Sequence, residues 1–343
     1  MEKAIFEQKA VAKKSIIVKF QEMEKLKFID LFCGIGGFRI AMDQACKENN
    51  ILPECVFSSD IDKFCQDSYE NNFGERPAGD ITKIDPKDIP DHDILFGGFP
   101  CQPFSIIGNM KGFEDTRGTL FHNIASIIKE KKPKAFVLEN VKQLVGHNKG
   151  QTLQVILNTL KKELKYTVRV AVLNALDYGL PQKRERVVIV GHKDPILFSY
   201  PHPVRPFKPL SEILEPNVDK KHIASDYIAT KRKEKHTSAY KLSIWHENKS
   251  GNICSYPYSC ALRAGASYNY LLVNGERRLT PREMFRLQGF PDSYKIIEND
   301  TQARKQAGNA VPVNLVKAVI LKLLPYVAET CDMKSVLYDY EIL

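Results

Sequence analysis

The chain has 343 residues, of which 43% are hydrophobic and 27% are charged. This balance is typical of a globular protein and excludes a disordered or fibrous chain. No apolar run approaches the roughly 18 residues that a membrane-spanning helix needs. The first 25 residues are rich in Lys and Glu and lack the apolar core of a secretory signal. We therefore expect a cytoplasmic protein with one large domain and room for a small one.

The net charge indicates a class of partner, and the cysteine spacing indicates which kinds of stabilising site to expect. Fifty Lys and Arg against 41 Asp and Glu give a net charge of +9, which favours a polyanionic partner. Residues 192–277 hold 13 Lys and Arg and 8 Asp and Glu, so more than half of the excess lies in one quarter of the chain. The eight cysteines show no Cys-x-x-Cys spacing, which predicts neither a disulfide scaffold nor a metal site.

Residues 25–191 alternate short apolar runs with helical patterns. This rhythm predicts an α/β fold with a doubly wound, mostly parallel sheet. The expected strands cover residues 26–32, 54–58, 93–98, 134–138, 166–173 and 187–190. The expected helices cover residues 37–48, 120–131 and 151–164.

Six prolines between positions 195 and 216, followed by a polar stretch without a helical period, interrupt this rhythm. We expect a second, smaller domain over residues 192–299. Thr280 as N-cap and Pro281 in the first turn predict a short helix over residues 280–288. An apolar helix over residues 313–327 would complete the first domain, which resumes at about residues 300–330. Residues 1–24 are predicted to form a charged extension.

A glycine-rich turn follows the first expected strand. Glycines 34, 36 and 37 would let the backbone approach a ligand at the carboxyl edge of the sheet. Asp60 closes the next strand, 24 residues after Gly36, where an acid can hydrogen-bond a ribose. Asp80 is placed to receive an adenine amino group. Taken alone, tight-turn glycines and solvated acids explain these residues equally well.

Cys101 has the most distinctive local context in the chain. It lies between Pro100 and Pro103, directly after a strand that ends in Gly97 and Gly98. Neither proline suits a helix interior or a sheet ladder, so the loop is expected to be stiff. Its thiol would lie at the carboxyl edge of the sheet, which favours a nucleophile, reactive as the thiolate, over a buried structural cysteine.

Two further groups of polar residues lie at strand ends. Glu139 closes a buried strand and is expected to act as a carboxylic acid with a raised pKa that can hydrogen-bond a ring nitrogen. An exposed strand-end acid is the alternative. Gln182, Arg184 and Arg186 share one face of a strand by the period of two, which would direct three donors at a single target. An exposed edge strand is the alternative here.

Nine short motifs, in this order, make the chain similar to a known family. They are FCGIGG (32–37), Asp60, GDI (79–81), GFPCQ (98–102), RGTLF (117–121), ENV (139–141), QKRER (182–186), RLTPRE with QGFP (278–291) and GNAVP (308–312). Together they resemble the DNA (cytosine-5) methyltransferases of bacterial restriction–modification systems. The match extends from residue 27 to about residue 327, apart from the variable tract.

The resemblance implies a reaction and a cofactor. Cys101 would attack C6 of a cytosine, and C5 would then take a methyl group from S-adenosylmethionine. Glu139 would hydrogen-bond N3 and the exocyclic amine, and Arg186 would contact O2 with Arg184 supporting nearby. No metal is required. The residues implied in cofactor binding are Phe32, Gly34, Gly36, Gly37, Asp60, Ile61, Asp80, Ile81, Gly98, Pro100, Leu120 and Asn309. Ile61 stands where some relatives have a Trp that stacks on the adenine.

The resemblance also implies duplex DNA as the partner. The target cytosine would be flipped out of the duplex, and residues 192–299 would form the target-recognition domain that grips phosphates and reads base edges. The candidate DNA-binding residues are Ser105, Gln182, Arg263, Ser267, Tyr268 and Asn269. We expect a monomer, associated with the nucleoid, whose cognate restriction endonuclease acts on the same sequence without being bound.

Three alternatives are weighed against this interpretation. A transfer RNA cytosine-5 methyltransferase shares the catalytic core, but its Cys-Phe-Thr tripeptide is absent. A silent DNA-binding relic would have no need for Cys101, Glu139 and Arg186. A dinucleotide oxidoreductase would share the fold, but the shortened glycine pattern and the Pro-Cys loop fit it poorly.

Overall fold

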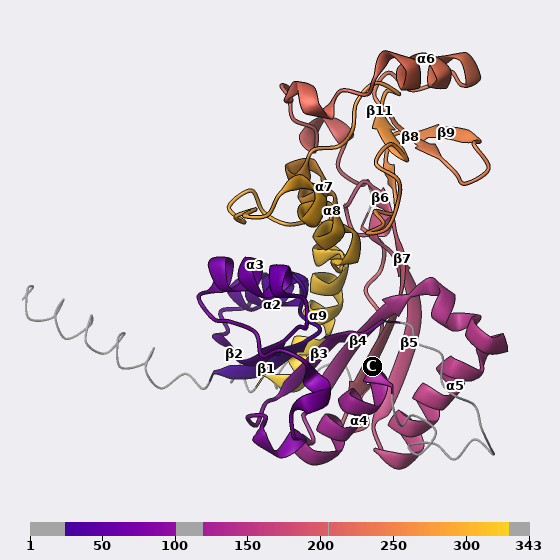
Figure 1. The fold of residues 1–343 in the computed structure, drawn as a ribbon. Helices are drawn as coiled ribbons and strands as arrows, with labels where there is room; N and C mark the ends of the chain where they lie inside the picture. Colours follow the sequence, from indigo (N-terminus) through magenta and orange to yellow (C-terminus); the bar gives the residue numbers. More distant parts are fainter. Residues whose placement is uncertain (1–24, 101–118, 205, 329–343) are drawn as a thin grey trace, which may run out of the picture.

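The computed structural model describes residues 25–100, 119–204 and 206–328. Cys101 and Ser105 lie outside the described residues. The centre of the structure is a six-stranded sheet with the order β2-β1-β3-β4-β7-β5 (Figure 1). Its strands are β1 Leu26–Leu31, β2 Pro53–Ser59, β3 Ile94–Gly98, β4 Ala135–Val141, β5 Thr167–Asn174 and β7 Glu185–His192.

The sheet is mostly parallel, as the sequence predicted. β1 pairs in parallel with β2 and β3, and β3 pairs in parallel with β4. β7 is the exception, because it runs antiparallel to both of its neighbours, β4 and β5. The predicted α/β fold is confirmed, and the direction of β7 is a feature that the hydrophobic pattern did not show.

Helices cover both faces of this sheet, because alternate residues of each strand contribute to two different cores. Phe96 and Val137 belong to one core with residues of α2 Gly37–Glu48 and α9 Val313–Val327. Leu95 and Phe136 belong to the other, with residues of α4 Leu120–Lys131 and α5 Gln151–Asn158. Strands buried on both faces read as continuous apolar runs, which explains why the sequence revealed them.

Three of the four expected helices that pack on the sheet have the predicted bounds, namely α2, α4 and α9. The fourth is α5, which continues as a π-helical turn over Thr159–Glu163. The helix α3 Lys63–Phe73 follows β2 and ends at Gly74 in the left-handed conformation. Short 3-10 turns cover Ile81–Lys83, Pro86–Asp88, Lys142–Val145, His147–Gly150, Ala175–Asp177, Leu210–Glu212 and Lys220–His222.

Residues after β7 build a smaller lobe above the sheet edge (Figure 1). It contains the antiparallel sheet β11-β8-β9, formed by Leu271–Val273, Ile244–Glu247 and Ile253–Tyr256. The sequence suggested no helical period here, yet α6 forms over Asp226–Lys235, with Arg232 as its single buried residue. A solvent-facing helix of this kind has no apolar stripe, so its sequence shows no helical period.

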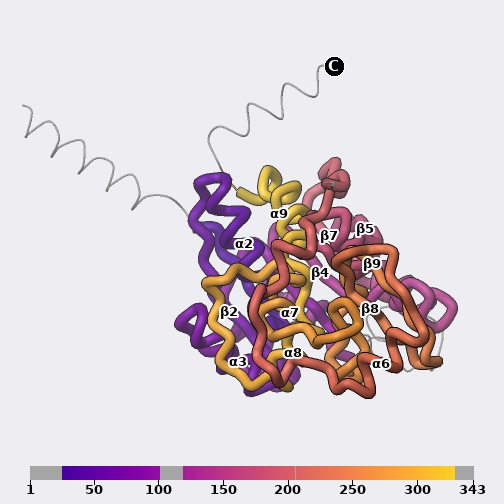
Figure 2. The backbone as a smooth tube through the Cα atoms, turned by 90° about the horizontal axis from the view of Figure 1, so that it is seen from above, coloured from indigo at the N-terminus to yellow at the C-terminus, as the bar shows by residue number. Residues whose placement is uncertain are grey.

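Two elements join the smaller lobe to the large sheet. The short strand β10, Ser259–Cys260, pairs in parallel with β6, Gln182–Lys183. The helix α7, Pro281–Leu287, starts with the predicted Thr280 N-cap, completed as a capping box by Glu283. Seen from above, α8, Asp300–Asn309, lies beside α3 (Figure 2), where Gln306 donates a hydrogen bond to the Phe64 carbonyl at 3.0 Å.

Within the described part of the chain, one stretch is long and apolar enough to cross a membrane by length and composition alone. It runs from Asp300 to Val327 and comprises α8 and α9. However, 61% of its apolar window is buried inside the protein, and α9 packs along α2. Its apolar character is therefore accounted for by its place in the core.

Candidate active site

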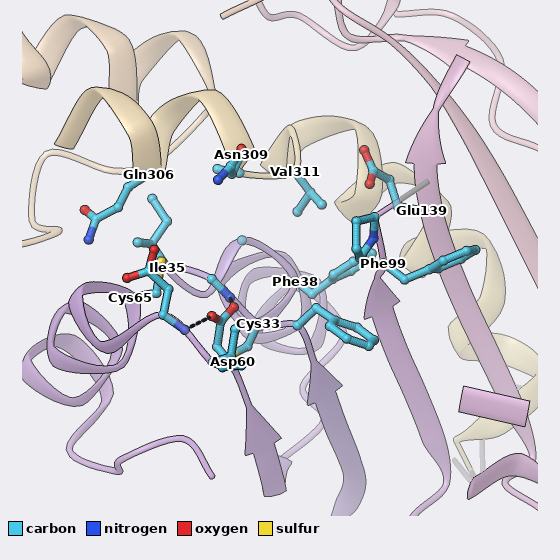
Figure 3. A pocket seen from close by; sticks show the side chains of 18 of the residues that line it. Cys33, Ile35, Phe38, Asp60, Cys65, Phe99, Glu139, Gln306, Asn309 and Val311 are labelled. Atoms are coloured by element: carbon cyan, nitrogen blue, oxygen red, sulfur yellow. Dashed lines mark hydrogen bonds between the residues drawn. The ribbon is translucent and has the colours of Figure 1, made fainter. Parts of the chain in front are cut away.

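A cavity of about 510 Å³ opens at the carboxyl ends of β1, β2, β3 and β4 (Figure 3). Open α/β sheets bind ligands at this edge. The cavity is lined by these residues of the predicted cofactor set: Phe32, Gly34, Gly37, Asp60, Ile61, Asp80, Ile81, Gly98, Pro100, Leu120 and Asn309. In Figure 3, Asp60 projects from a strand end, and Gln306 and Asn309 lie on the facing wall.

Gly36 is the predicted residue that does not line the cavity. Its φ is +82°, and a Cβ atom on it would lie 2.3 Å from the Phe73 ring. It therefore serves the close packing of the glycine turn against α3. Gly37 serves another contact, because its Cβ would lie 2.6 Å from Val311 on the facing wall. Phe32 lines the cavity with a φ of +55°, a strained conformation of the kind found at ligand sites.

Asp60 ties the end of β2 to the glycine turn. One carboxylate oxygen accepts the Gly34 amide hydrogen at 2.8 Å, and the other accepts that of Asp62 at 2.8 Å. Burial raises the pKa of Asp60, and the two backbone donors partly offset that effect. Each oxygen keeps a lone pair, so the carboxylate can also accept bonds from a ligand's hydroxyl groups.

Asp80 presents an ionised acceptor on the same cavity. Its carboxylate accepts hydrogen bonds from the Thr82 hydroxyl at 2.7 Å and from the Thr82 amide at 3.0 Å. These bonds lower the pKa of Asp80. Nearby, the Ile61 side chain is 71% exposed and lines the cavity, so it offers an apolar surface to a bound ligand.

Glu139 and Arg186 form an ion pair at the cavity wall. Arg186 Nε lies 2.6 Å from Glu139 Oε1, and about a tenth of each side chain is exposed. Both residues line the cavity together with Pro100. Cys101, the predicted nucleophile, is the next residue after Pro100 and lies outside the described residues. The pair can present both a hydrogen-bond acceptor and a cation to one planar ligand.

Asn140 is a site residue to which the sequence analysis gave no role. Its side-chain amide donates a buried hydrogen bond of 2.8 Å to the Phe99 carbonyl. It thereby fixes the backbone directly before Pro100 to the end of β4. The signal was present in the ENV motif, but a buried amide cannot be distinguished from an exposed one without the fold.

Of the three residues predicted to converge on one target, Arg184 and Arg186 both line the cavity, whereas Gln182 does not. Gln182 is fully buried, and its amide donates to the Leu287 carbonyl at 2.9 Å. Arg184 is also buried and donates to three backbone carbonyls. Only Arg186 reaches Glu139. The strand is interrupted at Arg184, so the period of two does not hold across it.

The candidate DNA-binding residues of the smaller lobe fall on one loop, residues 261–270, which we call the recognition loop. Arg263, Ser267 and Tyr268 are exposed. The guanidinium groups of Arg278 and Arg304 lie 4.6 Å and 4.0 Å from the centre of the Tyr268 ring. The Asn269 side chain accepts a bond of 2.7 Å from Arg278, so its oxygen already has a partner within the protein.

The facing wall of the cavity includes residues that the sequence analysis did not single out. Gln306 donates to the Ser68 hydroxyl at 2.9 Å, and Lys305 pairs with Asp62 at 2.7 Å. These bonds hold α8 against α3 across the mouth of the cavity. Within the described ranges, no group of three or more His, Cys, Asp and Glu side chains is arranged to hold a metal ion.

Comparison with known proteins assigns the family. The family model for C-5 cytosine-specific DNA methylases matches residues 26–324. The chain is 56% identical over 297 residues to the Type II methyltransferase M.NgoBI of Neisseria gonorrhoeae, covering 85% of this chain and 91% of that protein. It is 54% identical over 301 residues to the Type II methyltransferase M.HaeII of Haemophilus aegyptius, covering 87% and 92%.

Solved structures agree on the fold. The S. pombe Dnmt2 methyltransferase matches with a TM-score of 0.68 at 22% identity, over 88% of this chain and 98% of that one. The Entamoeba histolytica methyltransferase EhMeth matches with a TM-score of 0.68 at 19% identity, over 88% and 98%. The chain thus belongs to the C-5 cytosine-specific DNA methylase family and is a Type II DNA (cytosine-5) methyltransferase.

Proposed function

We propose that this enzyme methylates one cytosine within a short, specific sequence of duplex DNA, through a covalent adduct between Cys101 and C6 of a flipped base. The observation that carries the proposal is the Glu139–Arg186 ion pair of 2.6 Å on the wall of the cavity that Asp60 and Asp80 also line. One cavity thus combines groups suited to a pyrimidine with groups suited to a nucleoside.

S-adenosylmethionine fits this cavity in size and chemistry. A volume of about 510 Å³ lies within the range of small-molecule sites. Asp60 would accept bonds from the ribose hydroxyls, Asp80 would accept the adenine amine, and Ile61 would contact the adenine face. When bound, this cofactor supplies a methyl group activated by its sulfonium. No residue in our proposal requires a metal.

The protein's own groups would activate the cytosine. The Cys101 thiolate forms a bond to C6, and the electron pair displaced from the C5–C6 double bond makes C5 nucleophilic. When the base is bound, Glu139 would take up a proton from solvent, donate it in a hydrogen bond to N3 and accept one from the exocyclic amine. Arg186 would contact O2, so both groups would stabilise the negative charge that develops on the ring. Once C5 carries the methyl group, its proton would pass to water, the electron pair of the C5–H bond would restore the C5–C6 double bond, and the C6–S bond would break to release the Cys101 thiolate.

Duplex DNA would bind between the large sheet and the smaller lobe, with residues 192–299 as the target-recognition domain. Since C5 and C6 lie inside the base stack, the cytosine must leave the duplex, at a cost of a few kcal/mol. Arg263, Ser267 and Tyr268 are the exposed candidates for DNA contact. We further propose a cytoplasmic, nucleoid-associated monomer that protects host DNA from a cognate restriction endonuclease that it does not bind.

Bisulfite sequencing of plasmid DNA tests this function. The plasmid is incubated with the full-length protein and S-adenosylmethionine, and a Cys101→Ser variant is treated in parallel. We expect protected cytosines at one position of one recurring sequence with the parent enzyme, and none with the variant. Methylation by the Cys101→Ser variant would contradict the covalent mechanism. Methylation of transfer RNA but not of plasmid DNA would contradict the choice of substrate.

A further inference from the structure

We propose that Arg184 is a positioning residue that couples the cofactor cavity to the recognition loop. The inference rests on the proposed function and assigns Arg184 a role outside the reacting atoms. Its guanidinium joins two parts of the chain that would contact different substrates under the proposed function. The consequence is that cofactor and duplex DNA favour the same arrangement of these two parts.

Arg184 donates hydrogen bonds in two directions from its position between β6 and β7. One terminal nitrogen donates to the Leu262 carbonyl at 2.9 Å, at the start of the recognition loop. The other donates to the carbonyls of Gly308 at 3.0 Å and Ala310 at 2.8 Å. These two residues flank Asn309 on the cavity wall. One side chain therefore bonds both to the recognition loop and to the wall of the cavity.

The cavity wall and the recognition loop are in close contact beside Arg184. A Cβ atom on Gly308 would lie 2.3 Å from the Ala264 backbone nitrogen, so the cavity wall and the recognition loop touch through their backbones. From the other side, the Gln182 side-chain oxygen accepts the Leu262 amide hydrogen at 3.0 Å. Both backbone polar groups of Leu262 are thus held by side chains of the QKRER segment.

Burial makes these bonds difficult to break. Arg184 is 1% exposed, and desolvation lowers its pKa to about 9. Among the described residues it has no carboxylate within ion-pair distance, so the three carbonyls are its hydrogen-bond partners, and the more distant Glu139 charge adds to the stabilisation of its cation. Moving either the loop or the wall would remove a carbonyl from a buried cation, which is strongly unfavourable. The two parts are therefore expected to move together.

The predicted quantity is the coupling factor, defined as the ratio of the duplex Kd without and with saturating S-adenosylhomocysteine. It is measured on the full-length protein, with a duplex that carries the sequence found by bisulfite sequencing. We expect a factor well above one for the parent enzyme. The variant Arg184→Lys keeps the charge but loses the forked guanidinium that reaches three carbonyls. We expect its coupling factor to be about tenfold lower than that of the parent, or to equal one if the parent factor is below ten.

Arg232 provides a matched control. It is also buried and donates to the recognition loop, at the Asn269 carbonyl, but its other partner is Glu247 within the smaller lobe. Arg232→Lys should weaken duplex binding with and without S-adenosylhomocysteine alike, and so leave the coupling factor unchanged. Gly308→Ala is a second probe, since it forces the wall away from the loop with Arg184 intact, and it should lower the factor too.

The results of these measurements distinguish a failure of the proposed coupling from a failure of the proposed methylation. An unchanged factor in both Arg184→Lys and Gly308→Ala would overturn the inference, and so would an equal loss in Arg232→Lys, which would indicate general loosening of the loop. A parent enzyme that methylates its sequence with a factor of one would overturn the coupling alone. A parent enzyme that methylates no DNA would overturn the proposed function and the coupling with it.

Discussion

Arg186 reaches Glu139 because β7 runs antiparallel to β4. In the register of these strands Arg186 lies opposite Val141, and Glu139 lies opposite Val188. Glu139 and Arg186 are therefore diagonal neighbours on one face of the sheet, within reach of a long side chain. The result is the ion pair of 2.6 Å at the cavity wall, made by the one antiparallel strand among the six.

Glu139→Gln tests the role of this pair. The change preserves the shape of the side chain but removes the charge that holds Arg186, so we expect methyl transfer to slow by about 10²–10³-fold. S-adenosylhomocysteine affinity should change little. Glu185→Gln is the control, because Glu185 pairs with the half-exposed Lys142 at 2.8 Å. Equal activity of the two variants would refute the assigned role of Glu139.

Asn140→Ala should lower kcat, because the backbone directly before Pro100 would no longer be fixed to the end of β4. The Phe99 carbonyl loses its buried donor, which should also cost about 1–3 kcal/mol of stability. Single-turnover methylation and urea unfolding measure the two effects. Asn72→Ala is the control, since Asn72 donates at 3.0 Å to the Lys295 carbonyl away from the cavity. A variant as stable and active as the parent would contradict the anchoring role.

Asp60→Asn should raise the KM for S-adenosylmethionine by about tenfold or more. One of the two carboxylate oxygens becomes an amide nitrogen and faces a backbone donor, Gly34 or Asp62, that it cannot accept from. The control is Asp85→Asn, because Asp85 accepts the Lys87 amide at 2.9 Å in a similar cap outside the cavity. An equal KM in both variants would argue against a cofactor role for Asp60.

Two substitutions separate contact with DNA from support of the recognition loop. Arg263 is exposed and its guanidinium lies 4.8 Å from the Tyr270 ring, so Arg263→Ala should weaken binding to the target by about 1–3 kcal/mol and relax its specificity. Tyr268→Phe keeps the ring that Arg278 and Arg304 contact and should bind as the parent does. Competition binding with altered duplexes measures both. Unaltered selectivity in Arg263→Ala would exclude it as a reader.

The raised pKa of the buried Asp30 should make the free energy of unfolding depend on pH. Burial raises its pKa to about 8, with Arg39 opposing the shift. Between the unfolded value of 3.8 and about 8 the folded protein holds a proton that the unfolded chain releases, so the contribution to stability is lost as the pH rises through this window. Above it, Asp30→Asn should be more stable than the parent by on the order of a few kcal/mol.

Urea unfolding from about pH 5 to about pH 9 measures this difference. The Asp30→Asn curve should be flatter than that of the parent across the window. Asp91→Asn serves as a control, because the Asp91 side chain is 93% exposed. Parallel pH profiles for the parent and Asp30→Asn would contradict the buried, proton-holding state of Asp30.

Local pattern was sufficient for much of the fold and for the cofactor side of the site. The bounds of α2, α4 and α9 followed from apolar spacing and turn residues, because each helix buries one face in a core. Asp60 could be placed beside the glycine turn because the ends of parallel strands share one edge of the sheet. The order of the motifs indicated the family.

Only the tertiary structure decided which polar side chains face the cavity and which are used inside the protein. Gln182, Arg184 and Arg186 alternate along five residues, yet Gln182 is buried away from the cavity, Arg184 lines the cavity while bonding to carbonyls, and Arg186 pairs with Glu139. Those partners lie far away in sequence, and strand direction depends on connections that a local pattern does not encode. A hydrogen-bonding side chain is specified by its partners, and long-range packing is what brings them together.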